Sequence, residues 1–172
     1  MPKNKKKLND EFFAAVVEGM SPGIEKVFRE FLYEIFENLN QKPIHLKFTK
    51  SINRKNERLC AYYDNGSKSI NIFVVNYLFA NKIKMKADLL HEVGHFLTFN
   101  ELGKYASKFP DEVSIHEYAA QRMAIDIAGR MKKYSIRSKL KEQIGLSWNN
   151  EKKYKEYKTA AKWAIQDGMI SK

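Results

Sequence analysis

The chain has 172 residues and a formal net charge of +11, with 44% hydrophobic, 13% aromatic and 30% charged residues. This length suits one compact domain with a real core, and the composition excludes collagen-like, disulfide-stapled and intrinsically disordered proteins. The single cysteine, Cys60, allows no internal disulfide; we expect it to be a small buried hydrophobe in a protein of the reducing cytoplasm.

The N-terminal third of the chain has the pattern of helices. Residues 1–7 hold four lysines and no acid, but Asp10 and Glu11 interrupt the next segment, so no export signal is predicted. No window approaches the roughly 18 uncharged apolar residues of a membrane span, so no membrane association is expected. Apolar residues at helical intervals predict two helices, over 8–20 and 22–39, broken at Ser21-Pro22-Gly23.

Residues 43–75 change to patterns that are typical of strands. Ile44, Leu46 and Phe48 alternate with polar residues, which predicts a half-buried strand whose His45 points away from the core. Two further strand-like segments flank Asn65-Gly66, a pair that suits the positive backbone angles of a tight hairpin turn. We therefore expect a small three-stranded antiparallel sheet.

Helical periodicity returns from about residue 84 to 99 and again from 113 to 131, with two more helical stretches near 135–143 and 150–166. The predicted fold class is thus α+β, with the small sheet packed on several helices. In the last stretch Tyr154, Tyr157, Ala161 and Ala164 recur at helical spacing, so both tyrosines are expected to face the core.

The basic charge is concentrated at the ends of the chain. Residues 130–172 hold 12 Lys or Arg against four acidic residues. We therefore divide the chain into a domain over 1–131, including the N-terminal helices, and a basic helical segment over 132–172. Such a segment can attract nucleic acid, or it can simply be a solvated helix face.

The motif that carries chemistry is His91-Glu92-Val93-Gly94-His95, which has the HExxH pattern. Two histidines four residues apart on a helix lie on one face and can bind a single zinc ion, with the intervening glutamate as general base. Apolar residues around the motif make this segment amphipathic, as the chemistry requires. The alternative is that the histidines merely pack or cap.

A catalytic zinc site usually has three protein ligands and an open position. The next predicted helix offers His116 and Glu117, with Asp111 and Glu112 just before them. We keep these residues as candidates for the third ligand.

The second helix adds a family resemblance. Its residues Glu117, Ala120, Gln121, Met123 and Ala124 follow the pattern E-x-x-A-(N/D)-x-(apolar)-A, except that Gln121 replaces Asn or Asp. Together with HExxH, residues 44–131 resemble the ImmA/IrrE-type zinc metallopeptidases. The resemblance implies a zincin-like fold, Zn²⁺ as the cofactor, Glu117 as the third ligand, and a cytoplasmic regulatory protease, often encoded on mobile elements, that cleaves a repressor-type protein.

Four residues in or near the motif have roles that need to be weighed. Glu117 could instead form a capping box with Ser114; we favour ligation, because the small residues after Glu117 let this helix approach the first. His116 is the reserve ligand. Asp88 lies one turn before the motif and either orients a histidine or is a plain surface residue. Gly94 indicates either that another element packs closely over the helix, which we favour, or that the helix simply tolerates a glycine there.

The predicted function is zinc-dependent hydrolysis of peptide bonds in a protein substrate, with zinc on His91, His95 and Glu117 and with Glu92 as the base. The group that stabilises the oxyanion stays open among Tyr105, Tyr118, His116 and Arg122. One alternative is a DNA-associated regulator or protease that uses the basic C-terminal segment. Another is a non-catalytic protein with a structural zinc, which the single cysteine disfavours.

Overall fold

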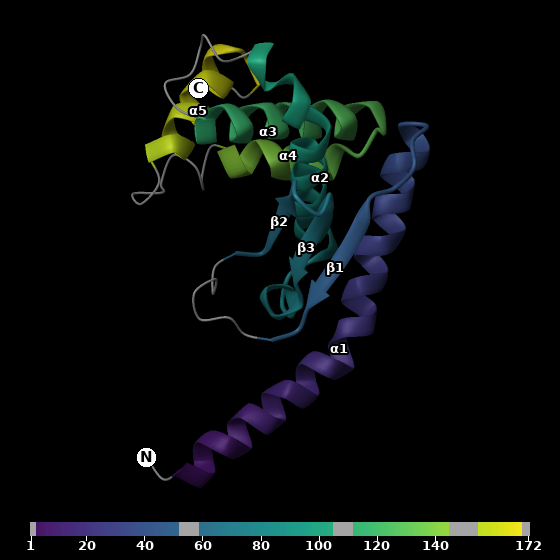
Figure 1. The fold of residues 1–172 in the computed structure, drawn as a ribbon, viewed down its shortest axis with the longest axis vertical. Helices are drawn as coiled ribbons and strands as arrows, with labels where there is room; N and C mark the ends of the chain where they lie inside the picture. The colour runs from purple at the N-terminus through teal and green to yellow at the C-terminus, as the bar shows by residue number, and fades with distance from the viewer. Residues whose placement is uncertain (1–2, 52–58, 105–111, 145–154, 170–172) are drawn as a thin grey trace.

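The computed structural model describes residues 3–51, 59–104, 112–144 and 155–169 (Figure 1). Their secondary structure confirms the α+β class. The elements in chain order are α1 (Lys3–Asn38), β1 (His45–Thr49), β2 (Ala61–Asp64), β3 (Ser69–Phe73), the 3-10 turn η2 (Val74–Tyr77), α2 (Lys82–Thr98), the 3-10 turn η3 (Phe99–Lys104), α3 (Glu112–Arg130), α4 (Tyr134–Glu142) and α5 (Lys155–Gln166).

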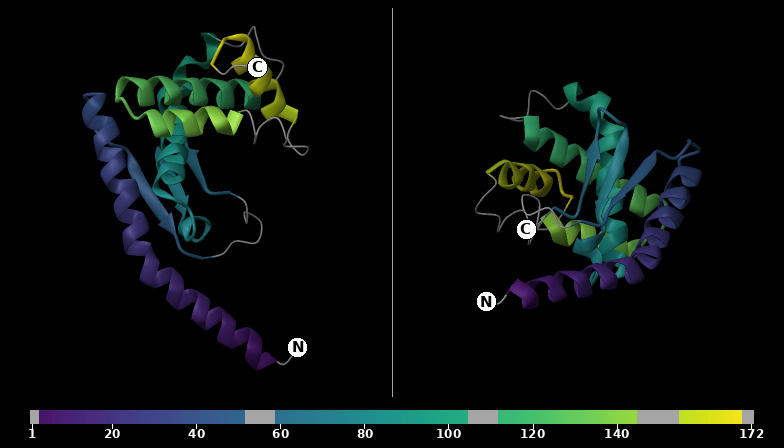
Figure 2. Two further views of the ribbon diagram at one scale, coloured as in Figure 1. Left: turned by 180° about the vertical axis from the view of Figure 1, so that it is seen from behind. Right: turned by 60° about the horizontal axis from the view of Figure 1, so that its bottom comes forward.

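The helices surround a central α2. The long α1 runs along one side of the sheet and extends well past it at its N-terminal end, whereas α3 and α4 lie side by side across α2 (Figures 1 and 2). The C-terminal helix α5 packs against α3. Within the described residues, no helix is long and apolar enough to cross a membrane.

The predicted break at Ser21-Pro22-Gly23 is wrong, because α1 continues through all three residues with Pro22 inside it. A proline removes one backbone hydrogen bond and crowds the preceding turn, which normally costs a helix about 3 kcal/mol. Here Val17, Ser21 and Ile24 are all buried on one continuous face, while Pro22 is exposed. We infer that burial of this face outweighs the local penalty.

The sheet is mixed rather than antiparallel, which corrects the predicted topology. Its strand order is β1-β3-β2, with β1 parallel to β3 and β2 antiparallel to β3. The buried Ile70 and Ile72 put β3 in the centre, so β1 pairs with β3 and not with its sequence neighbour β2. The predicted orientation of β1 is confirmed: His45 is exposed and Leu46 is partly buried.

The hairpin between β2 and β3 is present, but its turn is not the predicted one. Asp64 pairs with Ser69, which leaves a four-residue loop. In the described part of the chain, a positive φ occurs only at Asn40 (53°), Lys68 (47°), Lys132 (56°) and Gly168 (70°). The pair Asn65-Gly66 therefore does not supply the left-handed angles. Instead the Asp64 carboxylate shapes the loop by accepting hydrogen bonds from Gly66 N at 3.0 Å and Ser67 Oγ at 2.6 Å.

Helix α2 begins where its sequence provides a cap. The side chain of Asn81 accepts a hydrogen bond from the backbone N–H of Lys84 at 2.8 Å, which satisfies a donor of the first turn. Gly94 lies where α3 crosses: a Cβ at this position would lie 2.8 Å from the carbonyl carbon of Ala120. The predicted close packing over Gly94 is therefore confirmed.

The C-terminal helices share the core of the rest of the chain. Ile136 and Leu140 of α4 and Ala161 and Ala164 of α5 are buried in the same hydrophobic cluster as α1, α2 and α3. Tyr157 packs against this cluster, as predicted, and Tyr154 lies outside the described residues. Cys60 is only partly buried.

Candidate metal centre

The two histidines of the motif lie one above the other on α2. Their Nε2 atoms are 3.1 Å apart, and their rings meet edge to face with 4.6 Å between centroids. This arrangement follows from the four-residue spacing, which returns a side chain to the same helix face after one turn. Both imidazoles thus present a nitrogen to one point.

Glu117 completes the group from α3. Its carboxylate oxygens lie 3.2 Å from Nε2 of His91 and 3.6 Å from Nε2 of His95. Ligand atoms of a tetrahedral zinc with bonds near 2.0–2.1 Å are separated by about 3.3 Å, so these donors have the spacing of a zinc site. The three side chains form a group that could hold a metal ion.

The capping alternative for Glu117 is wrong. Helix α3 already includes Glu112, so Ser114 lies inside the helix and not at its N-cap. The Glu117 carboxylate points to the histidines of α2 instead. The small Ala120 at the crossing with Gly94 shows why α3 comes close enough to do so.

The electrostatics of the three side chains fit a cation. All three are largely buried, with 15% exposure of each histidine side chain and 13% of Glu117. Burial lowers the pKa of His91, but the hydrogen bond and charge of Glu117 outweigh this effect and raise the pKa to about 9. Burial and the neighbouring His91 lower the pKa of His95 to about 3. Without a metal, a single proton on His91 therefore balances the Glu117 charge.

Glu92 lies beside this group without belonging to it. It is 8% exposed, and its Oε2 accepts a hydrogen bond from the backbone N–H of Tyr63 at 2.8 Å. Tyr63 is in β2, an outer strand of the sheet. Burial raises the pKa of Glu92 to about 7, which is the range that suits a general base at neutral pH.

Gln121 orients His91 from α3. Its Oε1 lies 2.5 Å from Nδ1 of His91, and its Nε2 donates to the backbone carbonyl of Leu140 at 2.6 Å. A carbonyl can only accept, so the Gln121 amide must turn its oxygen toward His91. Nδ1 then carries the proton, and Nε2 keeps its lone pair for a metal.

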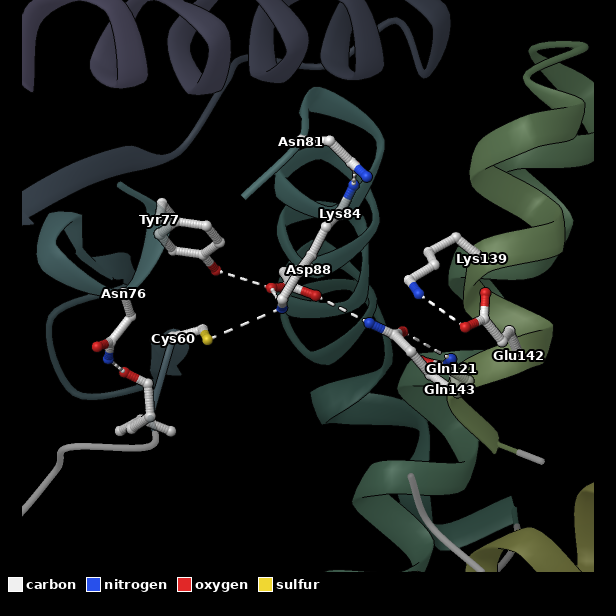
Figure 3. A network of polar contacts seen from close by, with 11 residues as sticks. Cys60, Asn76, Tyr77, Asn81, Lys84, Asp88, Gln121, Lys139, Glu142 and Gln143 are labelled. Atoms are coloured by element: carbon white, nitrogen blue, oxygen red, sulfur yellow. Dashed lines mark hydrogen bonds and ion pairs between the residues drawn. The ribbon is translucent and has the colours of Figure 1, made fainter. Parts of the chain in front are cut away.

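Asp88 contributes only indirectly, contrary to both of its predicted roles. It is 9% exposed and accepts hydrogen bonds from Tyr77 at 3.0 Å, Lys84 at 2.5 Å and Gln143 at 2.8 Å (Figure 3). Gln143 in turn contacts Gln121 at 3.4 Å. Asp88 is therefore neither a surface residue nor a direct partner of His91.

Two cavities meet at the centre. One, of about 280 Å³, extends toward the hairpin and Phe99, and the other, of about 200 Å³, extends toward Lys84 and Asp88. Both are lined by His91, Glu92, Glu117, Ala61 and Tyr157. Within the described residues, two cavities therefore border the candidate donors His91 and Glu117.

The remaining candidates from the sequence have different positions. His116 lines the larger cavity, with its ring centroid 6.5 Å from that of His95, but it does not join the donor group. Tyr118 and Arg122 contact Asp167 beyond the end of α5 instead of lining either cavity. Tyr105 and Asp111 lie outside the described residues.

Sequence reasoning missed three contributors. The Tyr63 backbone N–H, the Gln143 side chain and the Tyr157 hydroxyl all reach the centre from segments outside the motif. The helical stripe of α5 indicated that Tyr157 faces inward, but not what it meets. Backbone donors such as that of Tyr63 leave no trace in residue identity.

Comparison with known proteins gives no relative: no family model, no curated protein and no solved structure matches the chain.

Proposed function

We propose that the chain is a zinc-dependent metallopeptidase that hydrolyses peptide bonds of a protein substrate. The observation that carries the proposal is the convergence of His91, His95 and Glu117 on one point beside a buried Glu92. The resemblance to the ImmA/IrrE-type metallopeptidases, carried by HExxH and the Glu117 helix, points to the same activity. A zincin-like fold is part of this proposal.

The donor set favours zinc. Two imidazoles and one carboxylate are a common set in catalytic zinc sites, whereas structural sites are usually closed by four ligands rich in cysteine. A bound zinc ion lowers the pKa of water and polarises a carbonyl group. The cavities at the donors leave room for both reactants.

The residues of the chain divide the remaining work. Glu92, held at Oε2 by the Tyr63 N–H, accepts the proton of the attacking water and returns it to the leaving amine. Gln121 keeps His91 in the tautomer with the proton on Nδ1, which leaves the lone pair of Nε2 for the metal. Among the named oxyanion candidates that the structure describes, His116 lines the cavity, so it is the one we favour.

The substrate class comes from the resemblance alone. By that analogy the target is a repressor-type regulator, and the enzyme acts in the cytoplasm, in a system carried by a mobile element.

The alternative of a nucleic-acid-binding function has less support. Of the basic residues in 132–144, Lys133 forms an ion pair with Glu34, and Lys139 pairs with Glu142 at 2.9 Å. These acids reduce the positive charge that a polyanion would meet. A structural zinc would leave the buried Glu92 and the cavities beside it without a role.

The test begins with metal content. Untagged protein purified without chelator is expected to contain about one zinc per chain, and His95→Ala is expected to contain little. The zinc-loaded protein is then incubated with a peptide library derived from a proteome, and new termini are identified by mass spectrometry. A parent that takes up no zinc would overturn the proposal. So would a zinc-loaded parent that cleaves no peptide beyond those that Glu92→Gln also cleaves.

A further inference from the structure

The C-terminal helix α5 reaches the metal centre through one side chain. Tyr157 is close to the start of α5, and its hydroxyl donates to Oε1 of Glu117 at 3.4 Å. Tyr157 also borders both cavities at the centre. A helix outside the motif region therefore supplies a group that contacts a candidate ligand.

Packing fixes the place of this hydroxyl. Ala160, Ala161 and Ala164 of α5 are fully buried, and α5 lies against α3, which carries Glu117. Beyond the other end of α5, Asp167 accepts a hydrogen bond from Tyr118 and lies 3.6 Å from Arg122 Nη1, both residues of α3. Since α5 is buried against α3 along its middle and is also held to α3 at Asp167, the hydrogen bond to Glu117 is not the only contact that keeps Tyr157 in place.

A hydrogen-bond donor at one oxygen of a carboxylate influences which of its two oxygens ligates a metal. A carboxylate that ligates a metal through one oxygen can rotate unless its second oxygen is held, and such outer hydrogen bonds tune metal affinity. The Tyr157 hydroxyl holds Oε1, while Oε2 lies 3.2 Å from Nε2 of His91. Oε1 also lies 3.6 Å from Nε2 of His95, so the hydrogen bond from Tyr157 favours Oε2, the oxygen beside His91, as the one that faces the metal.

We propose that Tyr157 is a positioning residue for Glu117, through which α5 controls how tightly the centre retains its metal. This inference rests on the metal centre of the proposed function. It gives the C-terminal segment a part in the site that its basic composition does not suggest. Tyr157 acts through Glu117, so the effect is on the metal and not on a particular substrate.

The test compares two tyrosines that each lose one hydroxyl and keep their ring. Tyr157→Phe removes the donor to Glu117, whereas Tyr118→Phe removes a contact between α3 and the far end of α5. Zinc affinity of the full-length chain is measured by competition with a chromophoric chelator, together with thermal stability. The absorption spectrum of the cobalt-substituted protein reports the geometry of the ligands.

Tyr157→Phe is expected to bind zinc roughly 10-fold more weakly or worse and to change the cobalt spectrum. Tyr118→Phe is expected to melt at a lower temperature with unchanged zinc affinity and cobalt spectrum. Equal losses of affinity in both variants would assign the effect to docking of α5 and overturn the inference. Unchanged affinity in Tyr157→Phe would overturn it as well and leave the proposed function standing, whereas a parent that binds no zinc would overturn both.

Discussion

The Nδ1 atom of His91 lies 2.5 Å from the Oε1 atom of Gln121, and the amide nitrogen of the same Gln121 is bound to the Leu140 carbonyl. The direction of both contacts follows from Leu140, whose carbonyl has no proton to give. The end of α4 thereby fixes the tautomer of a histidine on α2. Gln121 of α3 and Leu140 of α4 together therefore orient one candidate metal ligand, His91 of α2.

Gln121→Met tests this arrangement. Methionine has similar length, but its thioether is only a weak acceptor for the His91 N–H, so we expect zinc affinity to fall by roughly 10- to 100-fold. The matched control is Gln143→Met, which leaves both the His91 contact and the Leu140 contact of Gln121 in place and should bind zinc nearly as the parent does. Chelator competition measures both. An equal loss in the two variants would contradict a direct role for Gln121.

Glu92→Gln separates catalysis from metal binding. The amide oxygen can still accept the Tyr63 N–H, but it cannot take a proton, so turnover is expected to fall by at least about 100-fold. Zinc content should stay at the parent value because Glu92 is not part of the donor group. Digestion of a peptide library and elemental analysis measure the two quantities. Loss of zinc together with activity would make Glu92 a ligand rather than a base.

The central part of the fold could be predicted because its signals are local. Apolar spacing predicts a helix over about 84–99, close to the observed Lys82–Thr98, and the four-residue spacing of His91 and His95 dictates their shared face. Even the approach of α3 could be inferred from Gly94, since a glycine inside a helix costs about 1 kcal/mol relative to alanine unless something requires it.

The rest depends on tertiary packing, which single residues do not encode. Pro22 predicts a helix break, yet the buried face around it keeps α1 continuous. β1 pairs with β3 because β3 is buried between two neighbours, not because of any pattern in β1 itself. The position of Tyr157 over Glu117 likewise depends on where α5 docks, 40 residues away in sequence.

Gly94→Ala is expected to destabilise the protein despite the better helix propensity of alanine. The added methyl would lie 2.8 Å from the carbonyl carbon of Ala120, so α3 must shift, at a cost of about 1–3 kcal/mol from overpacking. The control is Gly19→Ala in α1, where a Cβ meets nothing within 4 Å and where we expect a gain of roughly 0.5–1 kcal/mol. Urea unfolding of both variants gives the free energies. A stabilised Gly94→Ala would contradict the close packing of α3 over Gly94.

Zinc affinity should rise with pH through the neutral range. In the metal-free protein the pKa of His91 is about 9, so zinc must displace a proton from this ring at every lower pH. The pKa of His95 is lowered to about 3 and that of Glu117 is also lowered, so neither adds a proton near neutrality. The proton displaced from His91 predicts an affinity that increases by at least about tenfold per pH unit between about pH 6 and 8, because Glu92, whose pKa is about 7, also loses its proton in this range; the affinity levels off above about pH 9. Chelator competition at several pH values gives the slope, and calorimetry in buffers of different ionisation enthalpy counts the protons released.

His45→Gln, on the exposed face of β1, is the control for this pH dependence and should have the parent slope. An affinity independent of pH over this range would mean that His91 is already neutral before zinc binds, and that Glu117 does not hold a proton on it.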